Sequence, residues 1–141
     1  MNTVKFDLTK EHGIFKKLNA TNGGPWHKRH VNDQWRSNLD EYKAARIPYS
    51  RNHDSAVETI YGGPYSHDIT CIFPDFNADP TDPSSYDFPC TDESILVTLD
   101  AGTETFFRLG QTIEHQVKKH GTIHPAEFNK CAVICEHIIR H

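Results

Sequence analysis

The alternation of apolar and polar positions along the chain predicts three short strands, at about residues 14–20, 49–54 and 104–109. The first runs into a Gly-Gly-Pro loop, and the second follows a proline that ends the helix before it. The third is dense in β-branched and aromatic side chains and closes at a glycine. Turn-forming or helix-ending residues therefore accompany each of the three expected strands.

Apolar residues spaced three and four positions apart predict three helices. The first is expected over about residues 32–46, and the second starts near Asp92, whose charge suits a helix N-terminus, and ends at Gly102. Pro125 suits the first position of the last helix. That helix carries a continuous apolar stripe of Phe128, Cys131, Ala132, Cys135, Ile138 and Ile139.

A long loop is expected at residues 55–89, which contain five of the eight prolines, a Gly-Gly pair and a series of aspartates. Only a small strand is predicted inside it, at residues 69–73. Long loops within a compact domain are uncommon and are usually functional. The order of strands and helices is that of an α/β protein with a parallel sheet covered by helices.

Composition and charge exclude several classes of protein. The 141 residues include 15 basic and 19 acidic side chains, a net charge of −4 that does not favour nucleic acid as a partner. No apolar run approaches the ~18 to 20 residues of a membrane span, and the N-terminus lacks the apolar core of a secretory signal. Four cysteines are too few for a disulfide scaffold, so free thiols and a cytoplasmic location are expected.

Several segments together resemble a known family of enzymes. From residue 14 onward, nearly the whole chain is similar to the start of the catalytic barrel of glycoside hydrolase family 39, best known for β-xylosidases and α-iduronidases. The most specific matches are the Arg51-x-His53 strand and the Phe107-Arg108-Leu109-Gly110 strand. The other matching stretches are IFKKLNATNGGPWHKRH, EYKAAR, IFPDF and AGTETFFRLGQTIEH.

The resemblance implies a (β/α)8 TIM barrel, which needs at least ~200 residues. We therefore expect residues 1–141 to be a partial glycosidase barrel domain with the first three strand-helix units. In the family, the general acid/base is a Glu after an Asn at the end of the fourth strand, and the nucleophile is a Glu at the end of the seventh. Neither strand is expected here and no Asn-Glu dipeptide occurs, so no catalytic residue is assigned and the chain alone is expected to be inactive.

Three residues at the second expected strand are candidates for the sugar pocket, because barrel sites form at the carboxyl ends of the strands. Arg51 and His53 match the family motif and share one face of the strand. The planar guanidinium of Arg51 suits a carboxylate such as the missing nucleophile, and His53 suits a sugar hydroxyl. Asp54 could accept from another hydroxyl, although it faces the opposite side. A purely structural network of Arg51 and His53 is the competing interpretation.

Four further candidates lie in the loops after the first and third strands. Glu114 and His115 are placed for polar contacts with a substrate, or are solvated helix residues. Trp26 and His27 could offer an aromatic platform for a sugar ring, or pack under their loop. The expected partners are a carbohydrate substrate and the remainder of the barrel, and no cofactor is expected.

Two apparent metal motifs do not hold. Cys131, Cys135, His137 and His141 would place the two histidines on the opposite helix face from the cysteines, so one zinc ion could not reach all four. The Asp75-Phe76-Asn77-Ala78-Asp79 stretch lacks the glycine and glutamate of a calcium loop. The alternative function is a small α/β module that binds a carbohydrate or a partner and self-associates to cover its sheet.

Overall fold

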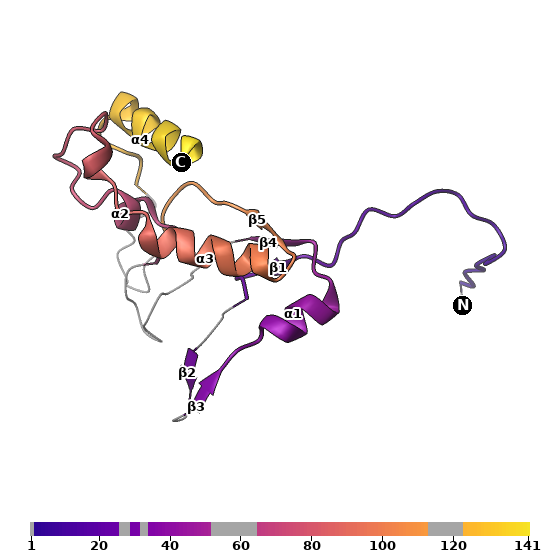
Figure 1. The fold of residues 1–141 in the computed structure, drawn as a ribbon. Helices are drawn as coiled ribbons and strands as arrows, with labels where there is room; N and C mark the ends of the chain where they lie inside the picture. The colour runs from indigo at the N-terminus through magenta and orange to yellow at the C-terminus, as the bar shows by residue number, and fades with distance from the viewer. Residues whose placement is uncertain (1, 26–28, 32–33, 52–64, 113–122) are drawn as a thin grey trace.

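The computed structural model describes residues 2–25, 29–31, 34–51, 65–112 and 123–141 (Figure 1). The strands are β1 (Thr21–Asn22), β2 (Arg29–Val31), β3 (Gln34–Arg36), β4 (Tyr49–Arg51) and β5 (Glu104–Phe106). The helices are α1 (Leu39–Ala45), α2 (Ile69–Ile72), α3 (Pro89–Asp100) and α4 (Phe128–Arg140), with a 3₁₀ helix η1 (Pro83–Ser85). None of the helices in these ranges is long and apolar enough to cross a membrane.

Three strands form a parallel sheet in the order β1-β4-β5, which is also their order along the chain. The registers Thr21↔Ser50 and Ser50↔Thr105 place three small hydroxyl side chains in one row across the sheet. Helices lie between successive strands in sequence, α1 before β4 and α3 before β5. The α/β class with a parallel sheet is therefore confirmed.

The hydroxyl row faces both α1 and α3. The Thr21 Oγ1 and Tyr42 Oη atoms are 3.0 Å apart, which joins the sheet to α1. On the α3 side, a Cβ placed on Gly24 would lie 3.0 Å from Thr98 Oγ1 and 3.8 Å from Ser50 Oγ. Ser50 and Thr98 are buried. Both helices therefore cover the same face of the sheet, and Gly24 allows the close approach of α3.

The opposite face of the sheet is bare among the described residues. Its side chains alternate with the hydroxyl row, as the pleat requires. Tyr49 is 46% exposed and Phe106 is 64% exposed. The other members of this bare face, Asn22, Arg51 and Glu104, are also exposed.

The expected first helix is shorter than predicted, because its first turns are a strand. β3 pairs with β2 in an antiparallel hairpin, with Val31 opposite Gln34. Only two residues separate these strands, which is the commonest hairpin loop length. The helix begins at Leu39 and ends at Ala45, and Arg46 after it caps the helix in a left-handed conformation with φ 49°. Trp35, which falls inside the helix predicted over residues 32–46, is therefore in β3.

The predicted strand at residues 14–20 is wrong. The pairing of β1 starts at Thr21, and residues 14–20 are exposed without strand partners, with Ile14 at 100% and Phe15 at 91% exposure. The third strand ends at Phe106 instead of residue 109, since Arg108 turns toward Asp68 and leaves the ladder. The second strand is found at Tyr49–Arg51, and residues 52–54 lie outside the described residues.

The predicted loop at residues 55–89 is more regular than expected. In its described part, Ile69–Ile72 form the helical turn α2 in place of a strand. Phe73 N donates to Ile69 O at 2.7 Å, and no strand among the described residues pairs with this segment. The helix α3 starts at Pro89, earlier than predicted, whereas α4 starts at Phe128 and not at Pro125.

A compact apolar cluster holds the second half of the chain together. Ile72 and Phe73 on and after α2 are fully buried against Ile134 and Ile138 of α4. Tyr86 packs on Phe73 with ring centroids 5.0 Å apart. We call these five residues the α2–α4 core. In Figure 1, α4 lies beside α2, away from the N-terminal segment.

Candidate functional site

The carboxyl ends of the three parallel strands place Asn22, Arg51 and Phe106 in one row on the bare face of the sheet. The registers Asn22↔Arg51 and Arg51↔Phe106 define this row. Side chains that project from the carboxyl ends of parallel strands form the ligand sites of most α/β enzymes. This end row is therefore the candidate site, and it contains Arg51, which the sequence predicted.

Arg51 is exposed and has few contacts among the described residues. Its Nη1 atom donates a hydrogen bond of 3.4 Å to Asn22 Oδ1. This contact is long, so it orients the guanidinium weakly. The guanidinium is exposed, and the other donors of its planar fork suit a carboxylate or vicinal hydroxyls.

The other predicted site residues lie outside the described residues. They are His53, Asp54, Glu114, His115, Trp26 and His27. Their predicted roles stay predictions. The sheet does place Arg51 at the end of β4, two positions before His53 in the sequence, as the motif requires.

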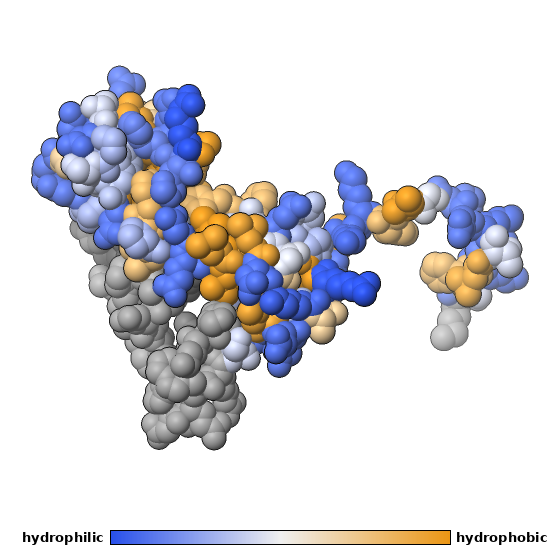
Figure 2. Space-filling model, in the orientation of Figure 1, coloured by the Kyte–Doolittle hydropathy of each residue, from blue (hydrophilic) through white to orange (hydrophobic). Residues whose placement is uncertain are grey.

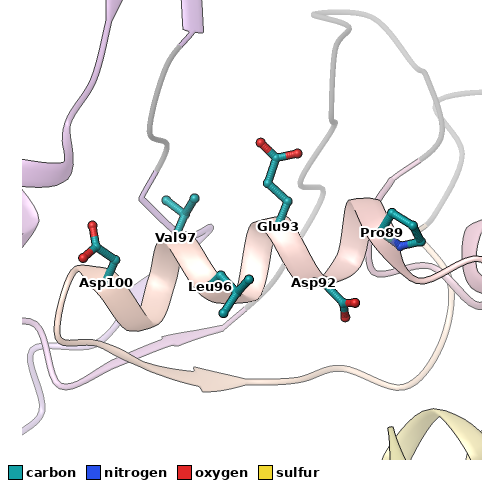
Figure 3. A pocket seen from close by; sticks show the side chains of 6 residues that line it. All are labelled: Pro89, Asp92, Glu93, Leu96, Val97 and Asp100. Carbon is teal, nitrogen blue, oxygen red and sulfur yellow. The ribbon is translucent and has the colours of Figure 1, made fainter.

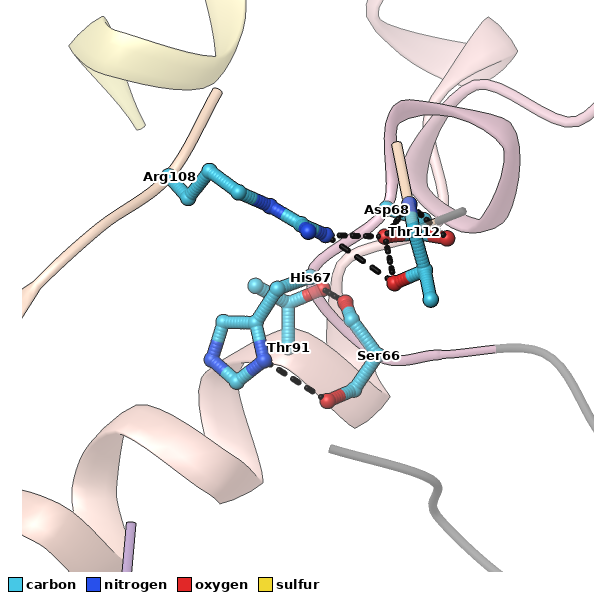
Figure 4. Close-up of polar contacts among 6 residues, drawn as sticks. All are labelled: Ser66, His67, Asp68, Thr91, Arg108 and Thr112. Atoms are coloured by element: carbon cyan, nitrogen blue, oxygen red, sulfur yellow. Dashed lines mark hydrogen bonds and ion pairs between the residues drawn. The ribbon is translucent and has the colours of Figure 1, made fainter. Parts of the chain in front are cut away.

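A buried polar network lies next to the carboxyl end of β5 (Figure 4). Asp68, which is 4% exposed, accepts hydrogen bonds from the backbone N and Oγ1 of Thr112, each 2.9 Å from Oδ1. Arg108 Nη2 forms an ion pair of 2.6 Å with the same Asp68 oxygen and donates to Thr112 Oγ1 at 3.0 Å. The carboxylate thus ties the segment before α2 to the segment after β5.

His67 extends this network into an apolar setting. Its Nδ1 atom lies 3.0 Å from Ser66 Oγ, and its ring meets Phe107 edge-on with centroids 5.4 Å apart. Burial, and next the nearby charge of Arg108, lowers the pKa of His67 to about 4. The histidine is therefore neutral at physiological pH. Thr91 Oγ1 donates to Ser66 O and anchors the network on α3.

The network was not predicted from the sequence, although one signal was available. Asp68 precedes the apolar run at residues 69–73 and is the N-cap of α2, a position that favours aspartate. Nothing local in the sequence pairs it with Arg108, which is 40 positions away. The network is structural in character, because Asp68 and His67 are buried and bonded to the chain itself.

A groove of about 470 Å³ runs along the outer side of α3 (Figure 3). Its described wall combines apolar and acidic side chains and consists of Pro89, Asp92, Glu93, Leu96, Val97 and Asp100. The groove residues lie on the side of α3 opposite the buried Thr91 and Thr98, and therefore away from the sheet. It is therefore separate from the end row of Arg51.

The described residues offer no cluster suited to a metal ion, since no three His, Cys, Asp or Glu side chains converge there. The four cysteines are free thiols and form no disulfide. Burial, and next the neighbouring Cys131, raises the pKa of the Cys135 thiol. Cys135 is therefore a protonated, weakly reactive thiol near neutral pH.

Comparisons with known proteins identify a solved structure that is similar to this chain. No protein-family model matches the chain, and no curated protein sequence matches it significantly. A solved structure of a glucosidase from Croceicoccus marinus is similar, with a TM-score of 0.67 and 27% sequence identity. The match covers 94% of this chain but 25% of the glucosidase chain. The mixed α/β structure is therefore compatible with part of a glycosidase-like domain.

Proposed function

We propose that the chain forms the first three strand-helix units of a (β/α)8 barrel in a glycoside hydrolase similar to family 39. In this proposal it contributes substrate contacts to the hydrolysis of O-glycosidic bonds, as in β-xylosidases. The acid/base and nucleophile carboxylates come from strands outside residues 1–141. The proposal applies to the partial domain as a whole, with a carbohydrate as its substrate and no cofactor.

One observation carries the proposal: α1 and α3 cover the same face of three sequentially adjacent parallel strands. Right-handed crossovers in a doubly wound sheet place helices on both faces, because the strand order reverses at a switch point. An unreversed order β1-β4-β5 keeps the helices on one side. This arrangement supports a barrel, in which further strands close the inner face of the sheet.

The surface area of the chain supports a partial domain. The chain exposes 11037 Å², whereas a compact monomer of 16.1 kDa is expected to expose about 7,400 Å². Part of the excess comes from residues 2–20, which are exposed throughout, and part from the bare face of the sheet, where Phe106 and Tyr49 are exposed. Contact with five further strand-helix units would cover this face.

The end row then has a defined role in the proposed reaction. Retaining glycosidases hold two carboxylates about 5 to 5.5 Å apart around the sugar. Arg51 presents a permanent positive charge from the wall of the pocket and orients the nucleophile carboxylate. Asn22 supports Arg51 through its Oδ1 atom, 3.4 Å from Nη1. His53 contacts a sugar hydroxyl two positions further along.

The test compares aryl glycoside hydrolysis by the isolated chain with that of a polypeptide in which the coding sequence after residue 141 is restored. We expect turnover only in the longer polypeptide, and a fourth strand that ends in Asn-Glu. Arg51→Ala should lower kcat/KM of the active form by about 100-fold, because the carboxylate loses its orientation. Arg140→Ala is the matched control, since Arg140 is exposed and pairs only with Glu136 among the described residues. Turnover by residues 1–141 alone would refute the proposal.

A second candidate function explains the same bare face. A small module could cover its sheet by pairing with another copy and bind a carbohydrate without hydrolysis. Hydroxyl-radical labelling of Phe106 in the isolated chain separates the two, because only the self-association of the module buries this exposed ring at the contact. In that case, restoring further sequence would produce no hydrolytic activity.

A further inference from the structure

The outer side of α3 is an exposed helix face with an unusual composition. Leu96 is 63% exposed and Leu99 is 52% exposed. The helix carries the acidic residues Asp92, Glu93 and Asp100 and no basic residue. Figure 2 shows apolar side chains gathered over this part of the molecule. A soluble helix seldom leaves such a face uncovered.

The acidic side chains of this face differ in whether they form ion pairs with other described residues. Asp100 Oδ2 lies 3.3 Å from Lys43 Nζ, and Asp92 Oδ1 lies 3.0 Å from His141 Nε2. Glu93 forms no ion pair with any described residue. Glu93 therefore sits beside the exposed Leu96 as a charge open to a partner.

Residues 13–18 have the complementary composition. Ile14, Phe15 and Leu18 are 100%, 91% and 81% exposed. Lys16 and Lys17 lie among them, and residues 13–18 contain no acidic side chain. Neither lysine forms an ion pair within the described part of the chain. The segment thus has three unburied apolar side chains and two positive charges.

We propose that residues 13–18 of one copy dock on the outer face of α3 of a second copy. The three apolar side chains cover Leu96 and its apolar neighbours in the groove, and the lysines pair with Glu93 and the acidic rim. Burial of apolar surface on both copies supplies the free energy of association, and the charges set the orientation of the two copies. Reciprocal exchange of the two segments forms a closed two-fold dimer.

The position of the segment favours a second copy over its own molecule. Asn19 Nδ2 makes a long contact of 3.5 Å with Arg46 O at the end of α1, which marks where the chain leaves the body next to Leu18. From this point the N-terminal segment projects away from the body (Figures 1 and 2). An extended arm of this kind is the usual element of segment exchange.

This docking does not rest on the proposed function. It involves the outer face of α3, whereas the proposed barrel closes on the opposite side of the sheet. A failure of the docking test therefore leaves the hydrolase proposal standing. A failure of the activity test likewise leaves the docking intact.

The test is sedimentation equilibrium of residues 1–141 over a range of concentrations, with charge-reversed variants. We expect a monomer-dimer equilibrium whose dissociation constant rises at least about tenfold in Lys16→Glu/Lys17→Glu and also in Glu93→Lys. Lys5→Glu/Lys10→Glu has the same change in net charge outside the segment and should leave the constant within about twofold. Glu41→Lys, on α1, is the corresponding control for Glu93→Lys.

A mixture of the two weakened variants, Lys16→Glu/Lys17→Glu and Glu93→Lys, provides the decisive test. Lys16→Glu/Lys17→Glu presents a negative arm to the acidic face of α3 and is repelled by it. The same arm should pair with the reversed face of Glu93→Lys and restore association in the mixture. Circular dichroism confirms that each variant is folded. A wild-type chain that is monomeric throughout, unchanged dimerisation in the variants, or no recovery in the mixture would each overturn the proposal.

Discussion

The two halves of the molecule are stabilised in different ways. The α2–α4 core is closed on itself, with Ile72, Phe73 and Ile134 completely buried. The parallel sheet is covered on one face by hydroxyl contacts to α1 and α3 and, among the described residues, is bare on the other. Two buried residues here are small and polar, Ser50 in β4 and Thr103 immediately before β5. The difference indicates that the second half can hold its own structure, whereas the sheet depends on further contacts.

The largest expected effect is at the network that joins the two halves. Asp68→Ala should lower the free energy of unfolding by about 3–5 kcal/mol, because it removes the carboxylate that pairs with the partly buried Arg108. Denaturant unfolding measures the change. Asp75→Ala is the control, since exposed Asp75 bonds to the nearby Asn77 N at 2.9 Å, and it should cost about 0.5 kcal/mol. Equal losses in the two variants would show that the network does not couple the halves.

The α2–α4 core gives the next effect. Ile134→Ala should cost about 3 kcal/mol, since it opens a cavity at a completely buried position. Ile139→Ala changes the same side chain on the same helix at a position that is 70% exposed, and should cost less than about 0.5 kcal/mol. Thermal unfolding measures the loss of stability in each of the two variants. A similar loss at both positions would contradict a closed core.

Acid should weaken the network through His67. Its pKa is lowered from 6.5 to about 4, so its contribution to stability is complete above pH 6.5 and is lost as the pH falls toward 4. The unfolded state then binds the proton more readily, and we expect a loss of about 2 kcal/mol by about pH 4.5. Unfolding experiments across this range, repeated with His67→Gln, measure the effect. A pH dependence that is identical in His67→Gln would exclude His67 as its source.

The smallest effect is expected on the bare face of the sheet. In the isolated chain, Phe106→Ala should change the free energy of unfolding by less than about 0.5 kcal/mol, because the ring is 64% exposed. In a polypeptide that completes the barrel the same substitution should cost about 3 kcal/mol. A large cost in the isolated monomer would show that the face is already covered.

The sequence predicted the elements whose signals are local. Periodicity and turn residues predict the α/β order, the strand β4 that ends at Arg51, and the apolar stripe of helix α4. Residues 14–20 have a strand-like composition, but a strand also needs a partner, and pairing begins only at Thr21. The same reason explains α2, where residues 69–73 pair with no strand in the part of the chain that the structure describes, and Ile69–Ile72 form a helical turn instead.

The candidate site was predictable only in part. Arg51 was identified because its motif is contiguous in sequence, and the sheet places it in the end row. The Asp68 and Arg108 ion pair spans 40 positions, so no local pattern contains it. Phe106 joins the end row through the β4 and β5 register, which a sequence read one segment at a time does not specify.

Hydroxyl-radical labelling of Tyr49 and Phe106 tests most directly whether the bare face is the inside of a barrel. We expect both rings to be labelled in the isolated chain and protected about tenfold or more when the remaining strands are restored, since they then face the barrel interior. Tyr86, which packs on Phe73 in the α2–α4 core, should be labelled equally in both forms. Labelling of Tyr49 and Phe106 that does not change on completion would contradict the claim that this face lines a barrel.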